Sequence, residues 1–274
     1  VGKTQLAKEL AGEVFGDRDA LIRIDMSEYG EKFNSTKLIG APPGYVGHED
    51  GGQLTEKVRR KPYSVVLFDE VEKAHPDIFN SLLQILDEGF ITDSLGRKVN
   101  FKNCLILLTS NVGQRRASEF SSSVGFTSNS EQKKHEESNS IIKKELSKTF
   151  SPEFINRIDE IIFFNSLTQE DLIKIIDVEL KKMYPRFEEI GYKITITKDL
   201  KEKISEAGYD PKYGARPLKR VLQKYIEDTI AELVITNKIK EGSKITLSYD
   251  PKVTDEDLAP IKVKIRNIPG NTDK

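Results

Sequence analysis

A lysine and a threonine at the start of the chain are residue types that bind phosphate. Gly2, Lys3 and Thr4 match the end of the motif G-x-x-x-x-G-K-[ST], in which the lysine contacts phosphates and the hydroxyl binds Mg²⁺. Apolar residues at positions 6, 7, 10, 11 and 14 keep helical spacing, so we expect a helix to begin here, where its dipole attracts anions. Because glycine-lysine-threonine is common, an ordinary helix start remains the alternative at this point.

Two adjacent carboxylates form a second candidate cluster. Asp69 and Glu70 directly follow an apolar run over Ser64–Phe68, which predicts a strand covered on both faces. Ligands of α/β sheets bind beyond the carboxyl ends of the strands. One carboxylate could hold Mg²⁺ while the other polarises an attacking water, and a cation would offset their repulsion. A solvated strand end is the alternative, but the presence of Lys3 and Thr4 upstream favours phosphate chemistry.

Two further polar residues could complete such a site. Asn111 follows the apolar run Cys104–Leu108, which predicts another buried strand, and its amide could orient a water or simply belong to a turn. Arg216 precedes Pro217 at a predicted helix start, where a cation is disfavoured by the helix dipole. Either a nucleotide phosphate or a nearby carboxylate is expected to compensate it.

Arg157 is a candidate for action across a subunit interface. Supplied from a neighbouring subunit, its guanidinium could neutralise charge in a phosphoryl-transfer transition state. The alternative is an ion pair with Asp159 or Glu160, which follow closely in the sequence.

Two segments carry apolar side chains where no core is expected. Tyr45 and Val46 lie between Gly44 and Gly47, so we expect an exposed aromatic that grips a partner, or else a tyrosine folded onto its neighbours. Val124, Gly125 and Phe126 lie within a serine-rich stretch, 118–140, that we expect to be a mobile loop. Such a tripeptide can fill a pocket of a partner or anchor the loop locally.

The elements that position these residues follow from the apolar pattern. Strands over Leu21–Asp25, Ser64–Phe68 and Cys104–Leu108 alternate with helices, one of them opened by Pro76, which predicts an α/β parallel sheet flanked by helices. After Thr168 the pattern becomes helical, with short strands near the end. We therefore expect a large α/β nucleotide-binding domain over 1–165 and a small, mostly helical domain with a short β-sheet over 166–274.

Composition excludes several classes of protein. The 274 residues carry 43 basic and 44 acidic side chains, a net charge of −1 that disfavours a nucleic-acid partner. No apolar run is long enough to span a membrane. The single cysteine, Cys104, excludes an internal disulfide and a cysteine-based zinc site. With no signal peptide before the first motif, we expect a reducing, cytoplasmic location.

The ordered motifs resemble a known family. The motifs of an AAA+ ATPase appear in their usual order: Lys3-Thr4, Leu67–Glu70, Thr109–Asn111, Asn156-Arg157 and Gly214–Pro217. The stretches Ile39–Gly47 and Val71–Asp77 are similar to the second ATPase module of Clp-type unfoldases. The tripeptide Val124–Phe126 resembles the ClpP-docking tripeptide of the ClpC type, which the ClpB type lacks.

The resemblance implies a role for each matching position. Gly2, Lys3 and Thr4 would bind ATP and Mg²⁺, Asp69 would support Mg²⁺, and Glu70 would activate water. Asn111 and Arg216 would sense the nucleotide, and Arg157 would act on a neighbouring subunit's nucleotide. Tyr45 and Val46 would form the first pore loop, and the stretch Glu88–Lys98 resembles the second. Because the motif around Lys3 lacks its front half, we expect the chain alone to bind ATP weakly or not at all.

The implied function is ATP-driven unfolding of polypeptides through the pore of a homo-hexamer. Tagged or unfolded proteins, adaptors and the ClpP protease are the implied partners, in the bacterial cytoplasm or the plastid stroma. Three alternatives stay open: a ClpB-like disaggregase that works without a protease, a DNA-linked AAA+ motor, and a module that serves only assembly and docking.

Overall fold

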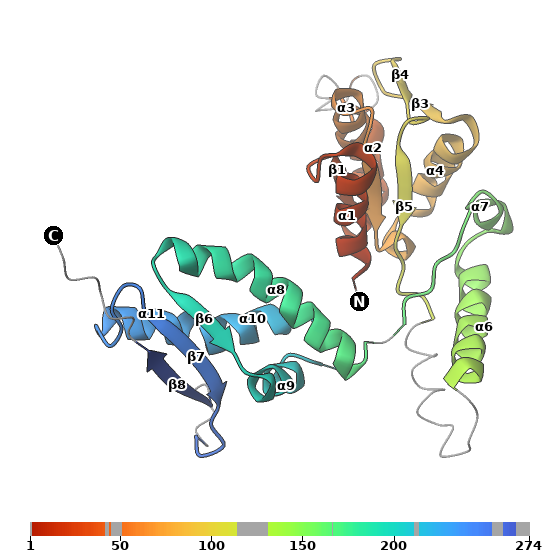
Figure 1. Cartoon of the computed structure of the whole chain (residues 1–274). Helices are drawn as coiled ribbons and strands as arrows, with labels where there is room; N and C mark the ends of the chain where they lie inside the picture. Colours follow the sequence, from red (N-terminus) through yellow and green to blue (C-terminus); the bar gives the residue numbers. More distant parts are fainter. Residues whose placement is uncertain are drawn as a thin grey trace. The chain divides into compact units, whose positions relative to one another are not determined.

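The structure of the chain is a computed structural model, which describes residues 2–41, 44, 51–113, 131–165, 167–210, 214–253 and 260–266. At positions 32, 33, 35 and 131–136 only the backbone is described. The chain divides into two compact units, Gly2–Phe163 and Phe164–Lys274 (Figure 1).

The first unit is built on a parallel sheet. Its strands are β1 (Leu21–Asp25), β2 (Val65–Asp69) and β5 (Leu105–Leu108), in the order β1-β2-β5. Asp25 pairs in register with Asp69, so the carboxyl ends of β1 and β2 lie side by side. The predicted α/β class with a parallel sheet is confirmed.

Helices and short connecting elements complete this unit. Pro76 begins α4, as predicted, and Gly89 is its C-cap. The α-helices are α1 (Lys3–Phe15), α2 (Lys32–Ile39), α3 (Gln53–Arg60), α4 (Pro76–Glu88), α6 (Glu131–Thr149) and α7 (Pro152–Asn156). The other elements are two 3₁₀ turns (Met26–Tyr29 and Val71–Lys73) and an antiparallel hairpin of β3 (Phe90–Thr92) and β4 (Lys98–Asn100).

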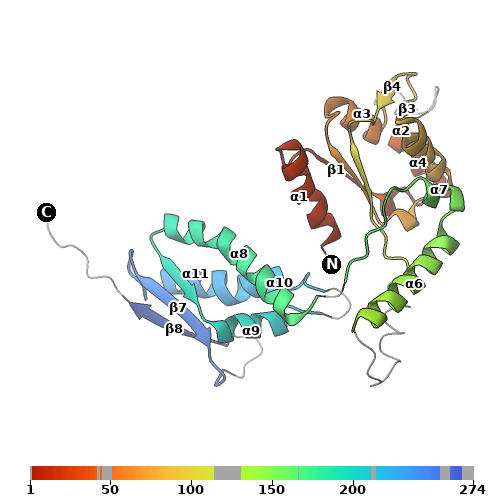
Figure 2. The same ribbon diagram turned by 45° about the vertical axis from the view of Figure 1, so that its right-hand side comes forward.

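Strand β2 is buried on both faces, as its apolar run predicts. Val66 and Phe68 pack into the main core with side chains from α2, α3 and α4. Val65 and Leu67 point to the other face, where they pack against α1 through small residues such as Ala7. Helices therefore cover both faces of the sheet (Figures 1 and 2), and the polar residues after β2 remain at its carboxyl edge.

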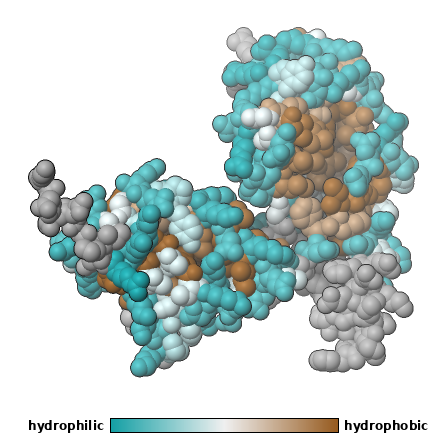
Figure 3. Space-filling model, viewed as in Figure 1, coloured by the Kyte–Doolittle hydropathy of each residue, from teal (hydrophilic) through white to brown (hydrophobic). Residues whose placement is uncertain are grey.

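Strand β5 differs from the prediction of a buried strand over Cys104–Leu108. It begins at Leu105, which is 36% exposed, and its other side chains are only half-buried. Among the described strands, β5 pairs with β2 alone. Figure 3 shows apolar surface, in brown, over this strand. The apolar run predicted the strand correctly, but an edge position leaves it less covered than expected.

The prediction of a mobile loop over 118–140 is wrong for its last part. The structure has helix from Glu131 onward, continuing to Thr149. Glutamate, glutamine and lysine are good helix formers and offset the serines in this stretch, and Leu146 packs against the main core. Residues 114–130 lie outside the described part of the chain.

The second unit has its own core around a small sheet. Its first helix begins after Thr168, as predicted, with a capping box formed by Thr168 and Asp171. Strand β6 pairs parallel with β7, which pairs antiparallel with β8. The elements are α8 (Gln169–Glu189), β6 (Lys193–Ile196), α9 (Lys198–Ala207), α10 (Leu218–Leu222), a π-helical turn (Gln223–Glu227), α11 (Asp228–Ile235), β7 (Lys244–Tyr249) and β8 (Ile261–Arg266). The predicted small helical domain with a short sheet is confirmed.

A search of the described helices for a membrane-spanning candidate gives none with the required length and apolar character.

Candidate active site

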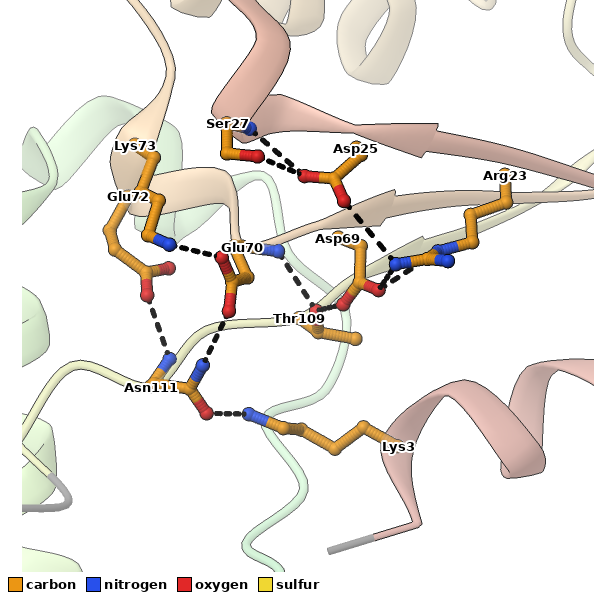
Figure 4. Close-up of polar contacts among 10 residues, drawn as sticks. All are labelled: Lys3, Arg23, Asp25, Ser27, Asp69, Glu70, Glu72, Lys73, Thr109 and Asn111. Atoms are coloured by element: carbon orange, nitrogen blue, oxygen red, sulfur yellow. Dashed lines mark hydrogen bonds and ion pairs between the residues drawn. The ribbon is translucent and has the colours of Figure 1, made fainter. Parts of the chain in front are cut away.

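The start of α1 places Lys3 over the carboxyl edge of the sheet. Gly2 is the N-cap and has a φ of 96°, a left-handed conformation that glycine adopts without strain. Lys3 Nζ donates to Ser110 O at 2.5 Å. It also donates to Asn111 Oδ1 at 2.6 Å (Figure 4). A cation and the N–H groups of a helix start therefore lie beside the loop that follows β5.

Asp69 ends β2 and both of its carboxylate oxygens accept hydrogen bonds. Thr109 Oγ1 donates to Oδ1 at 2.5 Å. Oδ2 accepts from Arg23 Nε at 3.0 Å and from Thr4 Oγ1 at 3.4 Å, and it lies 2.7 Å from Arg23 Nη2. The side chain is 12% exposed. This nearly buried carboxylate is thus compensated by a cation and two hydroxyls.

Glu70 has a left-handed backbone, with φ 57° and ψ 50°. A non-glycine residue pays on the order of 1 kcal/mol or more for this conformation. Two contacts hold it there, because the Glu70 N–H donates to Thr109 Oγ1 at 3.1 Å and the Val71 N–H donates to Thr109 O at 2.9 Å. The strained turn points the Glu70 side chain away from the strand and toward the loop after β5.

The Glu70 carboxylate contacts one cation and one amide. Lys73 Nζ donates to Oε2, and Asn111 Nδ2 donates to Oε1 at 3.4 Å. The hydrogen bond to Glu70 raises the pKa of the Lys73 ammonium. Glu72 fixes the loop after β5, because its Oε1 accepts a hydrogen bond from the Asn111 N–H at 3.1 Å. Its buried Oε2 has no hydrogen-bond partner in the described structure.

The residues that would bind Mg²⁺ fit that ion. Mg²⁺ prefers one or two protein oxygen ligands together with water and phosphate oxygens, rather than a cage of side chains. Thr4 Oγ1 and Asp69 Oδ2 lie 3.4 Å apart and offer such a pair. Among the described residues there is no group of three or more His, Cys, Asp or Glu side chains that could hold a metal ion.

Comparison with known proteins identifies the family of the chain. Residues 1–161 match the family model described as AAA domain (Cdc48 subfamily). The chain belongs to the AAA family. Residues 167–247 match a second model, the C-terminal, D2-small domain of ClpB protein. The predicted membership in the Clp-type branch is thereby confirmed.

Relatives of this AAA chain include proteins named ATP-dependent Clp protease ATP-binding subunit ClpC. The protein of this name from Staphylococcus aureus is 52% identical over 259 residues, which is 94% of this chain and 32% of the relative. The one from Staphylococcus epidermidis is 51% identical over 264 residues, 96% of this chain and 32% of the relative. The chain thus spans about a third of the length of these relatives.

The structure of the AAA module brings together only some of the predicted site residues. Lys3, Thr4, Asp69, Glu70 and Asn111 share one contact network, with Gly2 at its edge. They come from α1, from the end of β2 and from the loop after β5.

Arg157 lies outside this network, and Arg216 belongs to the other unit of the chain. Arg157 follows α7 and pairs with Asp87 of α4 at 2.5 Å, rather than with Asp159 or Glu160, the alternative partners considered from sequence. Arg216 is exposed and lies in the second unit, immediately before Pro217 at the N-cap of α10. The functional roles of both arginines stay predictions.

Five predicted site residues fall outside the described part of the chain. They are Tyr45, Val46, Val124, Gly125 and Phe126.

Sequence reasoning missed four residues that build the network. Arg23, Glu72, Lys73 and Thr109 all contact predicted site residues. Two signals were available: Arg23 is a cation inside an apolar strand, and Lys73 follows Glu70 by three residues. Thr109 directly follows an apolar strand, yet nothing in the sequence shows that its hydroxyl reaches β2.

Proposed function

We propose that the protein containing this chain hydrolyses ATP and uses the energy to thread polypeptides through a ring of six copies. The single observation that carries the proposal is the convergence of Lys3, Asn111 and Glu70 at the carboxyl edge of the sheet. A phosphate-binding cation, a water-orienting amide and a carboxylate base are what phosphoryl transfer to water requires. Family membership supports the same reading.

The residues divide the chemistry between them. Lys3 and the N–H groups of α1 bind the β- and γ-phosphates, and Thr4 and Asp69 hold Mg²⁺, which neutralises charge on the phosphates. Glu70 accepts a proton from the attacking water, and Asn111 orients that water. The Lys73 and Asn111 contacts hold the Glu70 carboxylate at one side of the cluster until nucleotide is bound.

The mechanical part of the proposal rests on the other predicted site residues. Tyr45 and Val46 contact the polypeptide in the pore, and Arg157 and Arg216 report the nucleotide state between subunits and between the two units. Val124–Phe126 docks the ring on the ClpP protease. The ClpC name of the relatives, at 52% and 51% identity, supports this assignment, and we place the protein in the bacterial cytoplasm.

Glu70→Gln in the full-length protein tests the chemical step. The amide cannot accept the proton, so ATP turnover should fall by about 10²–10⁴-fold while ATP binding persists. Glu28→Gln, at an exposed position on the 3₁₀ turn Met26–Tyr29, is the matched control and should leave turnover unchanged. Normal turnover in Glu70→Gln would remove Glu70 from its role.

Tyr45→Ala tests the threading step. It should keep ATP hydrolysis and abolish unfolding of a tagged substrate, because the side chain that grips the polypeptide is lost. Undiminished unfolding would refute the pore assignment. Replacing Val124–Phe126 by glycines should spare unfolding and abolish degradation by added ClpP.

A ClpB-like disaggregase is the second candidate. It is favoured by the match of residues 167–247 to the D2-small domain of ClpB protein. Reactivation of aggregates by the full-length protein, with no degradation when ClpP is added, would favour it over the ClpC-like function.

A further inference from the structure

Two stretches of backbone, one on each side of the segment that contains Tyr45 and Val46, lie against each other. Gly40 follows α2 and Gly52 precedes α3. A Cβ added to Gly52 would lie 2.5 Å from Ile39 Cα, and one added to Gly40, whose φ is 119°, would lie 3.3 Å from Gly52 N. The two ends are therefore in direct contact, and we call Ile39, Gly40 and Gly52 the loop base.

The turn between β3 and β4 packs against this loop base. A Cβ on Gly40 would overlap Ser94 Oγ and lie 2.8 Å from Ser94 Cβ. The Ser94 N–H donates to Ile39 O at 3.4 Å. The Ser94 hydroxyl is buried without a hydrogen-bond partner in the described structure, which costs free energy. Other contacts must hold the turn in place in spite of that cost.

Arg97 makes those contacts. Its guanidinium pairs with Asp93 inside the turn, with Nε and Nη2 each 2.7 Å from Asp93 Oδ2, and its Nη2 also pairs with Glu56 of α3. The Asp93 side chain is fully buried and accepts the N–H groups of Leu95 at 3.0 Å and of Arg97 at 2.8 Å. One rigid cation therefore joins the turn to α3.

The link continues from α3 to the loop base. The Glu56 N–H donates to Gly52 O at 2.9 Å. Gly51, with φ 69°, leaves room for this arrangement, because a Cβ there would lie 3.0 Å from Glu56 Cγ and 3.2 Å from Arg97 Nη2. Elements α3 and β4 are neighbours in the fold (Figure 1). The contacts run without interruption from Asp93 through Arg97 and Glu56 to Gly52.

We propose that Arg97 is a positioning residue that makes the loop base and the β3–β4 turn move as one body. The pairing of Arg97 with Asp93 and Glu56 fixes the distance between the β3–β4 turn and the loop base. A planar guanidinium fork holds this distance better than a lysine ammonium could. The functional consequence rests on the proposed threading: the loop base carries Tyr45 and Val46, and the turn lies within Glu88–Lys98. Both segments would then contact an unfolded polypeptide together, as one rigid unit.

Amide hydrogen exchange of the chain tests the mechanical link without any assumption about function. In Arg97→Gln we expect the Gly40 and Ser94 amides to exchange about tenfold faster or more, with β2 amides unchanged. Arg97→Lys should give a smaller effect. Arg59→Gln is the matched control, because Arg59 is the other cation on Glu56, at 2.9 Å, and does not contact the turn.

If Arg97 stabilises only the β3–β4 turn, its loss should change amide exchange in a different set of residues. Faster exchange confined to Leu95 and Arg97, with Gly40 unchanged, would overturn the inference. Should Arg97→Gln fail to fold, Glu56→Gln breaks the same link from the α3 side and should accelerate Gly40 in the same way. Unchanged Gly40 exchange in Glu56→Gln would then overturn it.

A second measurement in the full-length protein separates this inference from the proposed function. Arg97→Gln should raise KM for a tagged polypeptide by about fivefold or more, while Arg59→Gln leaves it unchanged. Tyr45→Ala is measured in parallel. If Tyr45→Ala abolishes unfolding but Arg97→Gln leaves KM unchanged, this inference fails and threading stands. If Tyr45→Ala has no effect, threading fails, and amide exchange alone decides whether the link exists.

Discussion

Arg23 of β1 reaches across the sheet to Asp69 of β2, with its Nη2 2.7 Å from Asp69 Oδ2. Asp25, its other partner, is more distant, at 3.4 Å. The carboxylate proposed to support Mg²⁺ therefore has a cationic partner of its own before a metal arrives (Figure 4). Since one oxygen cannot serve a guanidinium and a metal shell equally well, we expect Arg23 and Mg²⁺ to compete for Asp69.

Replacing Arg23 by glutamine should reveal this competition. Without Mg²⁺ the variant should lose about 1 kcal/mol of stability, because the pair is charged but Arg23 is half-exposed. Added MgCl₂ should raise its thermal midpoint more than that of the wild type. Differential scanning calorimetry with and without MgCl₂ measures both effects.

Arg18→Gln provides the control for Arg23. Arg18 pairs with Glu9 on the surface, away from Asp69, and its loss should not change the response to Mg²⁺. Equal Mg²⁺ responses in Arg23→Gln and the wild type would mean that Arg23 does not compete with the ion.

Thr109 offers a prediction about the strained turn. Its hydroxyl donates to Asp69 Oδ1 and accepts from the Glu70 N–H, so one group fixes both carboxylate residues. Thr109→Val keeps the shape but removes both hydrogen bonds, and should cost about 1–3 kcal/mol in urea unfolding. Thr109→Ser retains the hydroxyl and should recover most of that loss. Unchanged stability in the valine variant, together with a loss in the serine variant, would show that the methyl group matters and the hydroxyl does not.

The sequence predicted those helices and strands that a single local residue pattern determines. Four consecutive apolar residues before Asp69 leave no exposed face for β2, and Pro76 and Gly89 begin and end α4 because each fits one helix terminus. The positions of Lys3, Asp69 and Asn111 at element ends followed from the same patterns. Their meeting at one edge followed from the parallel sheet.

The rest depends on tertiary contacts that no local pattern carries. Strands of three residues such as Phe90–Thr92 are too short to show alternation, so the β3–β4 hairpin was missed. The Arg23–Asp69 contact exists only because β1 pairs with β2, an order that the sequence does not state. The half-exposed edge position of β5 likewise follows from strand order rather than from its four apolar residues.

Asp93 makes stability depend on pH in the acid range. Burial alone raises the pKa of Asp93, but hydrogen bonds from the Arg97 side chain and backbone outweigh it and leave the pKa below its usual value of about 3.9. The unfolded chain therefore binds the proton more readily than the folded one. Stability from this group is complete above about pH 4 and is lost as pH falls through the lowered pKa of the folded state.

Asp93→Asn should remove this acid-sensitive contribution. We expect the variant to be less stable than the wild type at neutral pH, with the difference narrowing below about pH 4. Unfolding by urea at several pH values measures the difference. Asp19→Asn, at an exposed position, is the control and should keep the pH dependence of the wild type. A constant gap between Asp93→Asn and the wild type down to pH 2 would contradict the assignment.

The pairing of Arg157 with Asp87 allows its two possible roles to be separated. The ion pair joins the end of α7 to α4, with side chains 49% and 31% exposed. If the pair serves only the fold, Arg157→Ala and Asp87→Asn should each lower the stability by the same small amount, about 1 kcal/mol or less, and both should leave function intact.

If Arg157 acts on a neighbouring subunit's nucleotide, Asp87→Asn releases the guanidinium without removing it. ATP turnover of the assembled full-length protein should then fall by about 10³-fold or more in Arg157→Ala and stay near normal in Asp87→Asn. Turnover that stays near normal in Arg157→Ala, as in Asp87→Asn, would assign Arg157 to the α4–α7 contact and withdraw it from the catalytic proposal.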